Sequence, residues 1–482
     1  MPDGGLHALS AIELAAALRR GETSPGEVLD HTLERAARLG HRVGAFASLA
    51  PEHARAEARR AEALLAAAQG AVDDGGLPPL LGVPCPVKDL TNVAGVPTTF
   101  GSAAFRGFVP DVDDGVVTRL REAGTVMVGK TTTPELGLPC YTEPVTAAPA
   151  RTPWDLSRSA GGSSGGAAAA VAAGIVPIAH GSDGGGSIRI PASACGLVGL
   201  KPSRGRISSG PWGVDGAGLA AHGVLTRDVA DTALALDVLA GPWPGDVLLL
   251  PGPRTTFLDA VRHDPGPLRV GVLVEPAIVA DAPVHPACLE AVARTAAVLA
   301  ELGHAVVEAP VPFPPERWEV FRALWTVGAL SVPVEPEAEP LLVPLTRWLR
   351  EEGRHVSGVE HALAVAAGQR LAREVAQAWA GLDVVLTPTL AQPPAPLGAL
   401  RDDADPAADF AAQTRFTPWT SVANLVGAPA ISLPVHRAEV DGVTLPIGVM
   451  LTGRLGGEEV LLGLAARLEE AMPWREHRPP LW

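Results

Sequence analysis

Two clusters of glycine and serine lie inside apolar, strand-like sequence and restrict the fold more than any other feature of the chain. The first covers residues 161–166 (GGSSGG) and the second covers residues 181–187 (GSDGGGS). Consecutive glycines permit unusual backbone angles, so backbone N–H groups can converge on one point. A flexible linker is the alternative, but linkers seldom occur within apolar sequence. We therefore expect two structured loops that can bind an anion or stabilise an oxyanion.

The sequence around these clusters predicts an α/β fold. The first 70 residues have a helical pattern, with a capping box at Ser10 and Glu13 and a second helix start at Ser24-Pro25 followed by Glu27. The pattern then changes, from about Leu81, to short apolar strands and glycine-rich turns. Apolar strands that alternate with helical stretches are typical of layered α/β proteins.

The expected elements after this change can be given by range. Short apolar strands and turns are predicted in residues 80–89, 125–130 and 167–183, further strands at 268–272 and 383–386, and helices at 286–302 and 359–379. Proline-rich connections occur near residues 241–253, 309–315, 332–340 and 388–396. These connections are either domain linkers or loops around one core, and their composition does not decide between the two.

Charge and composition exclude several classes of function. The chain has a formal net charge of −15 and no basic run, so we expect no nucleic-acid partner. The N-terminus lacks the basic flank and apolar stretch of a secretory signal, and the small-apolar run 167–179 is too short to span a bilayer. We therefore expect a cytoplasmic protein without a membrane partner. The scattered cysteines predict buried free thiols rather than a metal or redox site; they are Cys85, Cys140, Cys195 and Cys288.

Lysine is rare in this chain, whose basic residues are nearly all arginine. Only Lys88, Lys130 and Lys201 are lysine. A lysine amine can lose its proton when it is buried, whereas an arginine guanidinium effectively never does. In a chain that uses arginine almost everywhere else, a lysine indicates a position where arginine would not serve.

Three short motifs point to other chemistry and are rejected on their context. Residues 124–131 match the phosphate-binding P-loop pattern, but their intervening residues are β-branched and apolar, as in a buried strand. Residues 161–165 match the nucleophile elbow of α/β-hydrolases around Ser163, yet the preceding sequence is polar and turn-like and supplies no strand. His180 could be a general base, but a single histidine at the end of an apolar stretch is more often structural.

The two clusters belong to a longer run, residues 161–206, and other blocks accompany it. These blocks are PVKDL around Lys88, GKTTTPELG at 129–137, and NLVGAPAISLP with LPIGVMLTG near the C-terminus. Together they resemble the amidase signature family of serine hydrolases over nearly the whole chain. The resemblance implies an α/β fold in which a large mixed β-sheet is wrapped by α-helices. It also implies a single domain over residues 1–482, with N-terminal helices in 1–70, a signature core in 81–235 and a variable substrate-pocket region in 251–410.

By position, the resemblance implies a catalytic set of three side chains. The nucleophile falls on Ser187, the bridging serine, which the family holds after a cis peptide bond, falls on Ser163, and the catalytic lysine falls on Lys88. Burial would lower the pKa of that lysine enough for it to act as a base and then as an acid. The implied oxyanion hole consists of backbone N–H groups of Gly184, Gly185, Gly186 and Ser187. No cofactor and no metal are implied.

Other side chains around the implied site have open or structural roles. Asp183 and Arg189 flank the nucleophile, and we expect them to form a scaffold ion pair. Four aromatic residues of the variable region either line an apolar cleft or pack in the core; they are Trp318, Phe321, Trp325 and Trp348.

The implied function is hydrolysis of a linear or cyclic carboxylic amide, which releases an acid and an amine or ammonia. Residues 167–206 are most similar to the branch of the family that contains hydrolases of 6-aminohexanoate cyclic dimer. The alternative is an amidotransferase A-type subunit that generates ammonia for tRNA-bound glutamate. Such subunits carry a polar residue after Ser-Ile-Arg, where this chain has Ile190. We expect a small-molecule amide as the partner, and a homodimer is left open.

Overall fold

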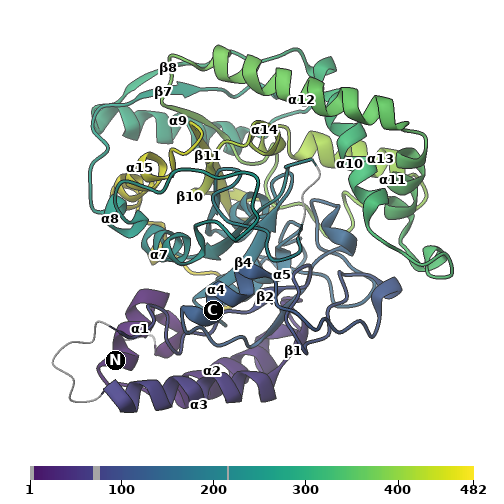
Figure 1. Ribbon diagram of the computed structural model, residues 1–482. Helices are drawn as coiled ribbons and strands as arrows, with labels where there is room; N and C mark the ends of the chain where they lie inside the picture. The colour runs from purple at the N-terminus through teal and green to yellow at the C-terminus, as the bar shows by residue number, and fades with distance from the viewer. Residues whose placement is uncertain (1–4, 69–75, 214–216) are drawn as a thin grey trace.

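An eight-stranded mixed sheet forms the centre of the molecule (Figure 1). The computed structural model describes residues 5–68, 76–213 and 217–482. The order of the strands is β4-β6-β5-β10-β11-β9-β7-β8, and β7 is parallel to both β8 and β9, while the other neighbours are antiparallel. The expected large mixed sheet is therefore confirmed. Its strands are β4 (Ile178–Asp183), β5 (Val198–Lys201), β6 (Ala221–Thr226), β7 (Arg269–Val272), β8 (Ala305–Glu308), β9 (Val384–Pro388), β10 (Ala430–Val440) and β11 (Val443–Gly453).

A second, three-stranded sheet lies beside the start of β4 and carries Lys88. Its order is β1-β3-β2, with β1 antiparallel and β2 parallel to β3. The strands are β1 (Phe46–Leu49), β2 (Val87–Lys88) and β3 (Gly129–Thr131). β1 corrects the all-helical expectation for the first 70 residues, because its pairing partner β3 lies some 80 residues further along the chain and is invisible to local periodicity.

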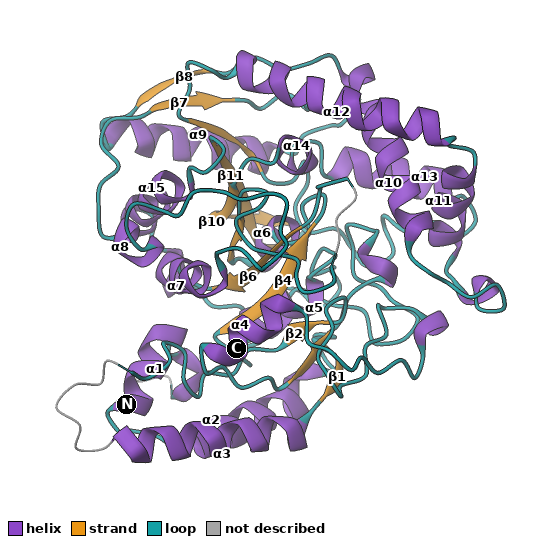
Figure 2. Cartoon of the chain, in the orientation of Figure 1, coloured by secondary structure: helices purple, strands orange, loops and turns teal. Residues whose placement is uncertain are grey.

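Helices surround the large sheet on both faces (Figure 2). Before β4 they are α1 (Ala11–Arg19), α2 (Pro25–Arg35), α3 (Pro51–Ala68), α4 (Gly115–Glu122) and α5 (Gly165–Ala172). Between β4 and β9 they are α6 (Arg189–Cys195), α7 (Val229–Leu239), α8 (Phe257–Val261), α9 (Pro286–Glu301), α10 (Glu319–Ser331), α11 (Pro344–Arg354) and α12 (Gly358–Ala378). The last are α13 (Pro406–Phe416), α14 (Thr420–Val426) and α15 (Glu458–Ala471).

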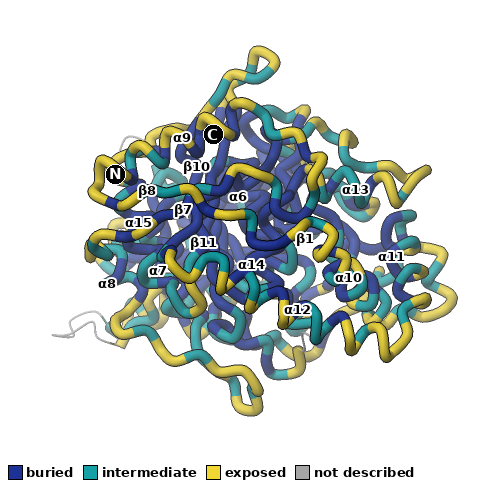
Figure 3. The backbone as a smooth tube through the Cα atoms, turned by 90° about the horizontal axis from the view of Figure 1, so that it is seen from above, coloured by how far each residue is buried: buried dark blue, intermediate teal, exposed yellow. Residues whose placement is uncertain are grey.

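Side chains alternate across the sheet and fill separate cores on its two faces. Val384 and Leu386 pack in the core that contains α7, α9 and α15, whereas Val385 packs in the core that contains α10, α12 and α14. Strands buried on both faces are continuous apolar runs in sequence. This explains why 268–272 and 383–386 were recognisable as strands. The buried strands lie at the centre, under a partly exposed outer layer (Figure 3).

Local capping signals agree with the structure at the N-terminal helices. The Ser10 and Glu13 capping box begins α1, and the Ser24 and Glu27 capping box begins α2. Both boxes satisfy N–H groups that have no partner inside the helix.

The alanine-rich part of residues 167–183 is not a strand. It forms the buried helix α5, and the strand β4 begins only at Ile178. Alanine has the highest helix propensity, and its small side chain lets α5 pack closely among other elements. At Gly166 an added Cβ would lie 2.4 Å from the backbone of Thr132, so this close approach requires glycine.

The proline-rich connections join segments that contribute to the same sheet. β5 and β6 precede residues 241–253, and β7 and β10 follow them, yet all are strands of the eight-stranded sheet. On this basis we propose that the chain is one domain and that these connections are loops.

Two further findings concern the described residues as a whole. All four cysteines are free and buried, as expected. Within residues 5–68, 76–213 and 217–482, no helix has the length and apolar character needed to cross a membrane.

Candidate active site

Lys88 lies at the end of β2, where its ammonium group meets the first Gly/Ser cluster. The side chain is fully buried. Its Nζ donates to Ser163 Oγ at 2.8 Å, and to the carbonyl and hydroxyl oxygens of Ser182 at 3.1 Å each. The hydrogen bonds therefore join Lys88 to both clusters.

Burial changes the proton affinity of Lys88. Removal from water lowers the pKa of its amine to about 7, against the opposing attraction of Asp183. A large fraction of the amine is neutral near neutral pH and can accept a proton.

Ser163 follows a cis peptide bond from Gly162, as the resemblance implied. The carbonyl of Ser163 accepts a hydrogen bond from Thr133 Oγ1 at 3.0 Å. Gly162 itself lies against the backbone of Tyr141, where an added Cβ would come within 2.7 Å. Only glycine fits beside that backbone.

The two Gly/Ser clusters are held together by the residue after Ser163. Ser164 N–H donates to the carbonyl of Ser187 at 3.1 Å. Its hydroxyl donates to the Ser182 carbonyl at 3.2 Å and accepts from Ser182 N–H at 3.3 Å. The backbones of Ser163 and Ser187 therefore lie close together. The Ser187 hydroxyl has no hydrogen-bond partner among the described residues, and Ser187 lines a cavity.

The loop 184–187 differs in one respect from the implied oxyanion hole. Gly186 N–H donates to Asp183 Oδ1 at 2.8 Å and is already used within the protein. The N–H groups of Gly184, Gly185 and Ser187 have no hydrogen-bond partner in the part of the chain that the structure describes. These three N–H groups are free to meet a negative oxygen.

Asp183 and Arg189 form the expected scaffold ion pair. Both side chains are fully buried, and Arg189 Nη2 lies 2.9 Å from Asp183 Oδ1. Arg189 also donates to the carbonyl of Thr420 and to Asn424 Oδ1, each at 2.7 Å. Burial alone would raise the pKa of the Asp183 carboxyl. Arg189 and the hydrogen bond from Asn424 nevertheless hold this pKa well below its usual range. The permanent carboxylate organises the loop 184–187.

His180 has a structural position beneath Lys88. Its Nδ1 accepts from the backbone N–H of Lys88 at 3.3 Å, which puts its proton on Nε2, where it faces Nδ1 of His222 at 3.2 Å. Burial, with the neighbouring His222 and Lys88, lowers the pKa of His180 well below its usual value, and burial lowers that of His222 to about 4. The imidazole pair is neutral and positions the strand that carries Lys88.

The other two rejected motifs, residues 124–131 and 161–165, also have ordinary structural explanations. Lys130 is buried, forms an ion pair with Asp89 at 3.2 Å, and donates to Thr91 O and Thr98 Oγ1. Residues 125–129, directly before it, are all buried. Isolated bridges at Arg158 and Ser159, rather than a strand, precede Ser163.

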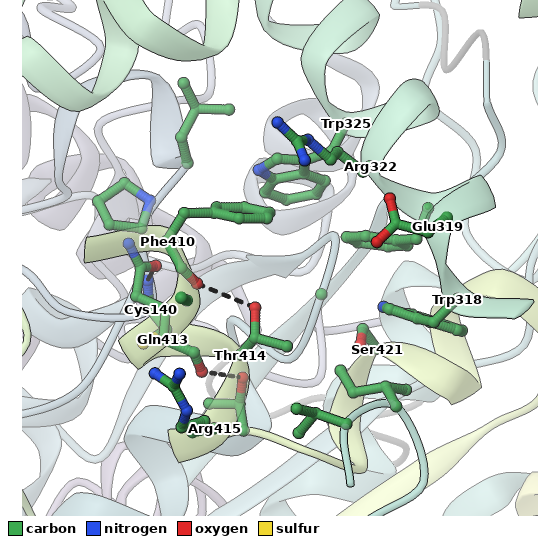
Figure 4. Close-up of a pocket in the computed structure, with 18 of the residues that line it drawn as sticks. Cys140, Trp318, Glu319, Arg322, Trp325, Phe410, Gln413, Thr414, Arg415 and Ser421 are labelled. Carbon is green, nitrogen blue, oxygen red and sulfur yellow. Dashed lines mark hydrogen bonds between the residues drawn. The ribbon is translucent and has the colours of Figure 1, made fainter. Parts of the chain in front are cut away.

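A cavity of about 340 Å³ opens onto Ser187 and Gly185 (Figure 4). The variable region contributes much of its lining, including all four of the aromatic residues whose role the sequence left open. Residues outside 251–410 also line it. They are Leu138, Pro139 and Cys140, Ile190 of α6, Ala411, Gln413, Thr414 and Arg415 of α13, Thr417 after α13, and Ser421 of α14, in addition to Gly185 and Ser187. Within the described residues, no group of three or more His, Cys, Asp or Glu is arranged to hold a metal ion.

Comparison with known proteins identifies the family. A family model described as Amidase matches residues 27–462. The chain belongs to the Amidase family. The 6-aminohexanoate-cyclic-dimer hydrolase of Paenarthrobacter ureafaciens is 37% identical over 490 residues, which cover 97% of this chain and 95% of that protein.

Solved structures agree with this membership. A 6-aminohexanoate cyclic dimer hydrolase complexed with substrate has a TM-score of 0.89 and 34% identity, and covers 98% of this chain and 99% of its own. A bacterial aryl acylamidase of the amidase signature enzymes has a TM-score of 0.85 and 26% identity, with 98% of each chain covered. The protein is an amide-hydrolysing enzyme with the amidase signature fold.

Two residues around the candidate site could not be recognised from the sequence alone. Ser182 lies within the second cluster, but its position in the sequence does not predict its hydrogen bond with Lys88. Asn424 donates to the Asp183 carbonyl and carboxylate across 241 residues of chain. It opens the NLVGAPAISLP block, and that block was the available clue, although the role of Asn424 was not predicted.

Proposed function

We propose that the enzyme hydrolyses a linear or cyclic carboxylic amide through an acyl-enzyme on Ser187, with Ser163 as proton relay and Lys88 as base and acid. The single observation that carries this proposal is the 2.8 Å hydrogen bond from the buried Lys88 Nζ to Ser163 Oγ. A neutral amine in this position can accept the Ser163 proton, and Ser163 can in turn accept the proton of a neighbouring hydroxyl.

In the acylation step, Ser187 Oγ forms a bond to the amide carbon while its proton passes to Ser163 Oγ and the Ser163 proton passes to Lys88 Nζ. The tetrahedral intermediate then collapses, the carbon–nitrogen bond breaks, and the protonated Lys88 returns a proton through Ser163 to the leaving amine. Water repeats the sequence on the ester, which releases the carboxylic acid and restores Ser187.

Charge on the carbonyl oxygen would be met by the three free N–H groups of the loop after β4. Loss of one such hydrogen-bond donor typically lowers kcat by about 10²- to 10³-fold. Because Gly186 N–H is bonded to Asp183, we assign the oxyanion to Gly184, Gly185 and Ser187 rather than to all four residues.

The reported relatives support a small carboxylic amide as the substrate. Two of them are named as cyclic-dimer hydrolase and aryl acylamidase, and both align along nearly the full chain. None of the reported relatives is named as an amidotransferase. We propose that the enzyme acts without a partner chain.

Covalent labelling tests the assignment of the nucleophile. A fluorophosphonate should label wild-type protein and the Ser163→Ala variant, but not Ser187→Ala, and mass spectrometry of the digest should find the adduct on Ser187. In parallel, the purified protein alone should release acid and amine from a panel of small amides. An adduct on Ser163 would refute the assignment, and turnover that requires a second protein would favour an amidotransferase.

A further inference from the structure

The cavity beside Ser187 has a wall of stacked aromatic rings. Trp318 lies just before α10, and Phe321 and Trp325 follow on the same face of that helix. The ring centroids are 5.0 Å apart between Trp318 and Phe321 and 5.3 Å apart between Phe321 and Trp325, with interplanar angles of 15° and 21°. Near-parallel rings at these distances overlap face to face with an offset, so Phe321 is covered by a ring on each face and the ring edges are left to contact other groups.

This wall touches the loop that carries the free N–H groups. A Cβ added at Gly184 would lie 3.5 Å from the Trp325 ring, and one added at Gly185 would lie 3.8 Å from Trp325 and 3.9 Å from Phe321. The ring edges are thus at van der Waals distance from the loop whose free N–H groups we assign to the oxyanion. A substrate group next to the scissile bond would lie beside these edges.

The opposite side of the cavity is also apolar where it faces this wall. Phe410 and Trp348 form a tilted pair with centroids 5.8 Å apart, and Leu138 lies near them. Figure 4 shows Phe410 on the other side of the cavity from Trp318. A flat group could be held between the two sides.

Most polar side chains that line the cavity are already paired within the protein. Gln413 accepts from Cys140 N–H at 2.8 Å and donates to Asp409 at 2.6 Å, and Thr414 donates to the Phe410 carbonyl at 2.9 Å. At the rim, Arg322 is paired with Glu352 and Arg415 with Asp281. The amide and guanidinium groups are therefore not free to select a polar substrate, whereas the exposed carboxylate of Glu319, which also lines the cavity, has no partner among the described residues.

Apart from Ser187, Ser421 is the buried lining residue whose hydroxyl is unpaired among the described residues. It is 6% exposed and lines the cavity. Its Cβ lies 4.0 Å from the Cβ position of Gly185, which puts it beside the reacting centre. Figure 4 shows its hydroxyl near the aromatic wall. One hydroxyl group is thus available to bind one polar substituent.

We propose that the substrate carries a planar aromatic ring next to its scissile amide, that the ring packs against the edges of Trp325 and Phe321, and that Ser421 binds a polar substituent of the ring. This inference rests on the proposed function of Ser187 and its loop. An edge-to-face aromatic pair contributes about 0.5–1.5 kcal/mol beyond burial of area, so a phenyl ring should gain about 2- to 12-fold over a saturated ring of similar size.

Matched amides test the ring without changing the reactivity of the bond. Phenylacetamide is compared with cyclohexylacetamide for the acyl side, and N-benzylacetamide with N-(cyclohexylmethyl)acetamide for the amine side. We expect kcat/KM to be higher by about 2- to 12-fold for the aromatic member of one pair, which assigns the side. Trp325→Leu should abolish that preference, while Trp348→Leu, on the opposite side, should keep a ratio above one.

A second comparison tests Ser421. Ser421→Ala should lower kcat/KM by about 5- to 10-fold for a hydroxyphenyl member of the preferred series, because one hydrogen bond is lost. It should change the unsubstituted phenyl member less than about twofold. Equal losses for both would show that Ser421 only supports the fold.

Failure of the ring proposal can be told apart from failure of the proposed function. If a fluorophosphonate labels Ser187 and hexanamide is hydrolysed while both aromatic preferences are absent, the ring proposal is wrong and the serine assignment stands. If Ser187 is not labelled, calorimetric titration of the Ser187→Ala variant with each amide pair still measures the preference for a ring in the absence of chemistry. Equal affinities for the two members of both pairs would then overturn the inference.

Discussion

Lys88 differs from another buried lysine by the group that its Nζ contacts. Burial lowers the pKa of both Lys88 and Lys201 to about 7. Lys88 Nζ donates to the Ser163 hydroxyl, however, whereas Lys201 Nζ donates to the carbonyl of Pro202. A low pKa therefore does not by itself identify a catalytic amine, and the contact with a hydroxyl that can carry a proton is the distinguishing observation.

Substitution of these two lysines gives a matched test of the relay. Lys88→Met should lower kcat/KM by about 10²- to 10⁴-fold, because the base is lost, and Lys88→Arg should be equally inactive, because a guanidinium stays protonated. Lys201→Met removes a buried amine of similar pKa away from Ser163 and should retain most of the activity. Rates of amide hydrolysis and circular dichroism spectra of the three variants check this; an active Lys88→Arg variant would contradict the relay.

The same amine predicts the pH dependence of the wild-type enzyme. The pKa of Lys88 is lowered, so the neutral base is the minority form below about pH 7 and the majority form above it. We expect kcat/KM to rise with pH through about 7 and to fall about tenfold per unit below that value. A profile of kcat/KM from pH 5 to 9 on one amide measures this, and a flat profile between pH 5 and 7 would be the opposite result.

At the scale of elements, the loop between β4 and α6 depends on one buried ion pair. Asp183 accepts from Gly186 N–H at 2.8 Å and Ile188 N–H at 3.1 Å, so the carboxylate fixes the direction of the neighbouring N–H groups. Arg189 in turn holds that carboxylate in place through Nε and Nη2, each at 2.9 Å. The geometry of the loop is thus set by the side chains of Asp183 and Arg189, which do not line the cavity.

Arg189→Lys should lower kcat and destabilise the fold together, because lysine cannot replace the bidentate hydrogen bonds. Removing one partner of a buried ion pair typically lowers the free energy of unfolding by about 3–5 kcal/mol. We expect a loss toward the lower end of this range, because lysine keeps the positive charge of Arg189. Arg206→Lys is the control, since Arg206 forms a comparable buried pair with Glu458 away from the loop. It should lower the free energy of unfolding in urea but leave kcat within about twofold. Equal effects of the two variants on kcat would show that the Arg189 pair has no special link to the loop.

Another contact between elements predicts a pH effect on stability. Glu469 in α15 accepts from Val229 N–H at the start of α7, close to Asp228 and Asp231. Burial and repulsion by Asp228 raise the pKa of Glu469 to about 8. Its folded-state pKa lies above the unfolded value, so its stabilising contribution is complete below about pH 4.5 and is lost as the pH rises toward 8.

Glu469→Gln imitates the neutral acid and should therefore stabilise the protein most at high pH. We expect the free energy of unfolding to exceed that of wild type by on the order of 1 kcal/mol at pH 8, with a smaller difference at pH 5. Urea unfolding at both pH values measures it. Glu470→Gln, at the exposed neighbouring position, should show no such pH-dependent gain; a gain of equal size there would assign the effect to surface charge.

At the scale of the whole molecule, one sheet is shared by the two halves of the chain. Within it, β5 pairs with β10 through Lys201 and Ala430, Leu200 and Ile431, and Gly199 and Ser432. The strands of both halves also contribute to one apolar core. Separation of the two halves at the connection 241–253 would leave this pairing edge and this core exposed in each half.

Fragments 1–250 and 251–482 should therefore fail to fold separately. Expressed alone, each fragment should be insoluble or lack a cooperative thermal transition, because β5 and β10 lose their partners. Expressed together, they should assemble and recover amide hydrolysis. Two separately folded fragments, each with its own cooperative transition, would contradict the proposal of a single domain.

Local patterns in the sequence determined the features that depend on near neighbours. The capping boxes at Ser10 and Ser24 and the apolar runs of β7 and β9 were readable because caps and buried strands involve residues only a few positions apart. The motif blocks also indicated the family and the chemical types of the site residues. The same local view missed β1, and it assigned the alanine-rich α5 to a strand region, because an apolar run does not reveal which partner covers it.

Only the tertiary structure decided which of these residues meet. The Lys88 and Ser163 side chains are 75 positions apart, and Asn424 lies 241 positions from Asp183, so their contacts depend on the order of strands in the two sheets. The use of Gly186 N–H by Asp183 and the contact of Trp325 with Gly184 likewise arise from packing between separate elements. The sequence by itself indicated the family and an amide-hydrolysing activity, whereas the three available N–H groups and the shape of the cavity are set by long-range packing that no local pattern records.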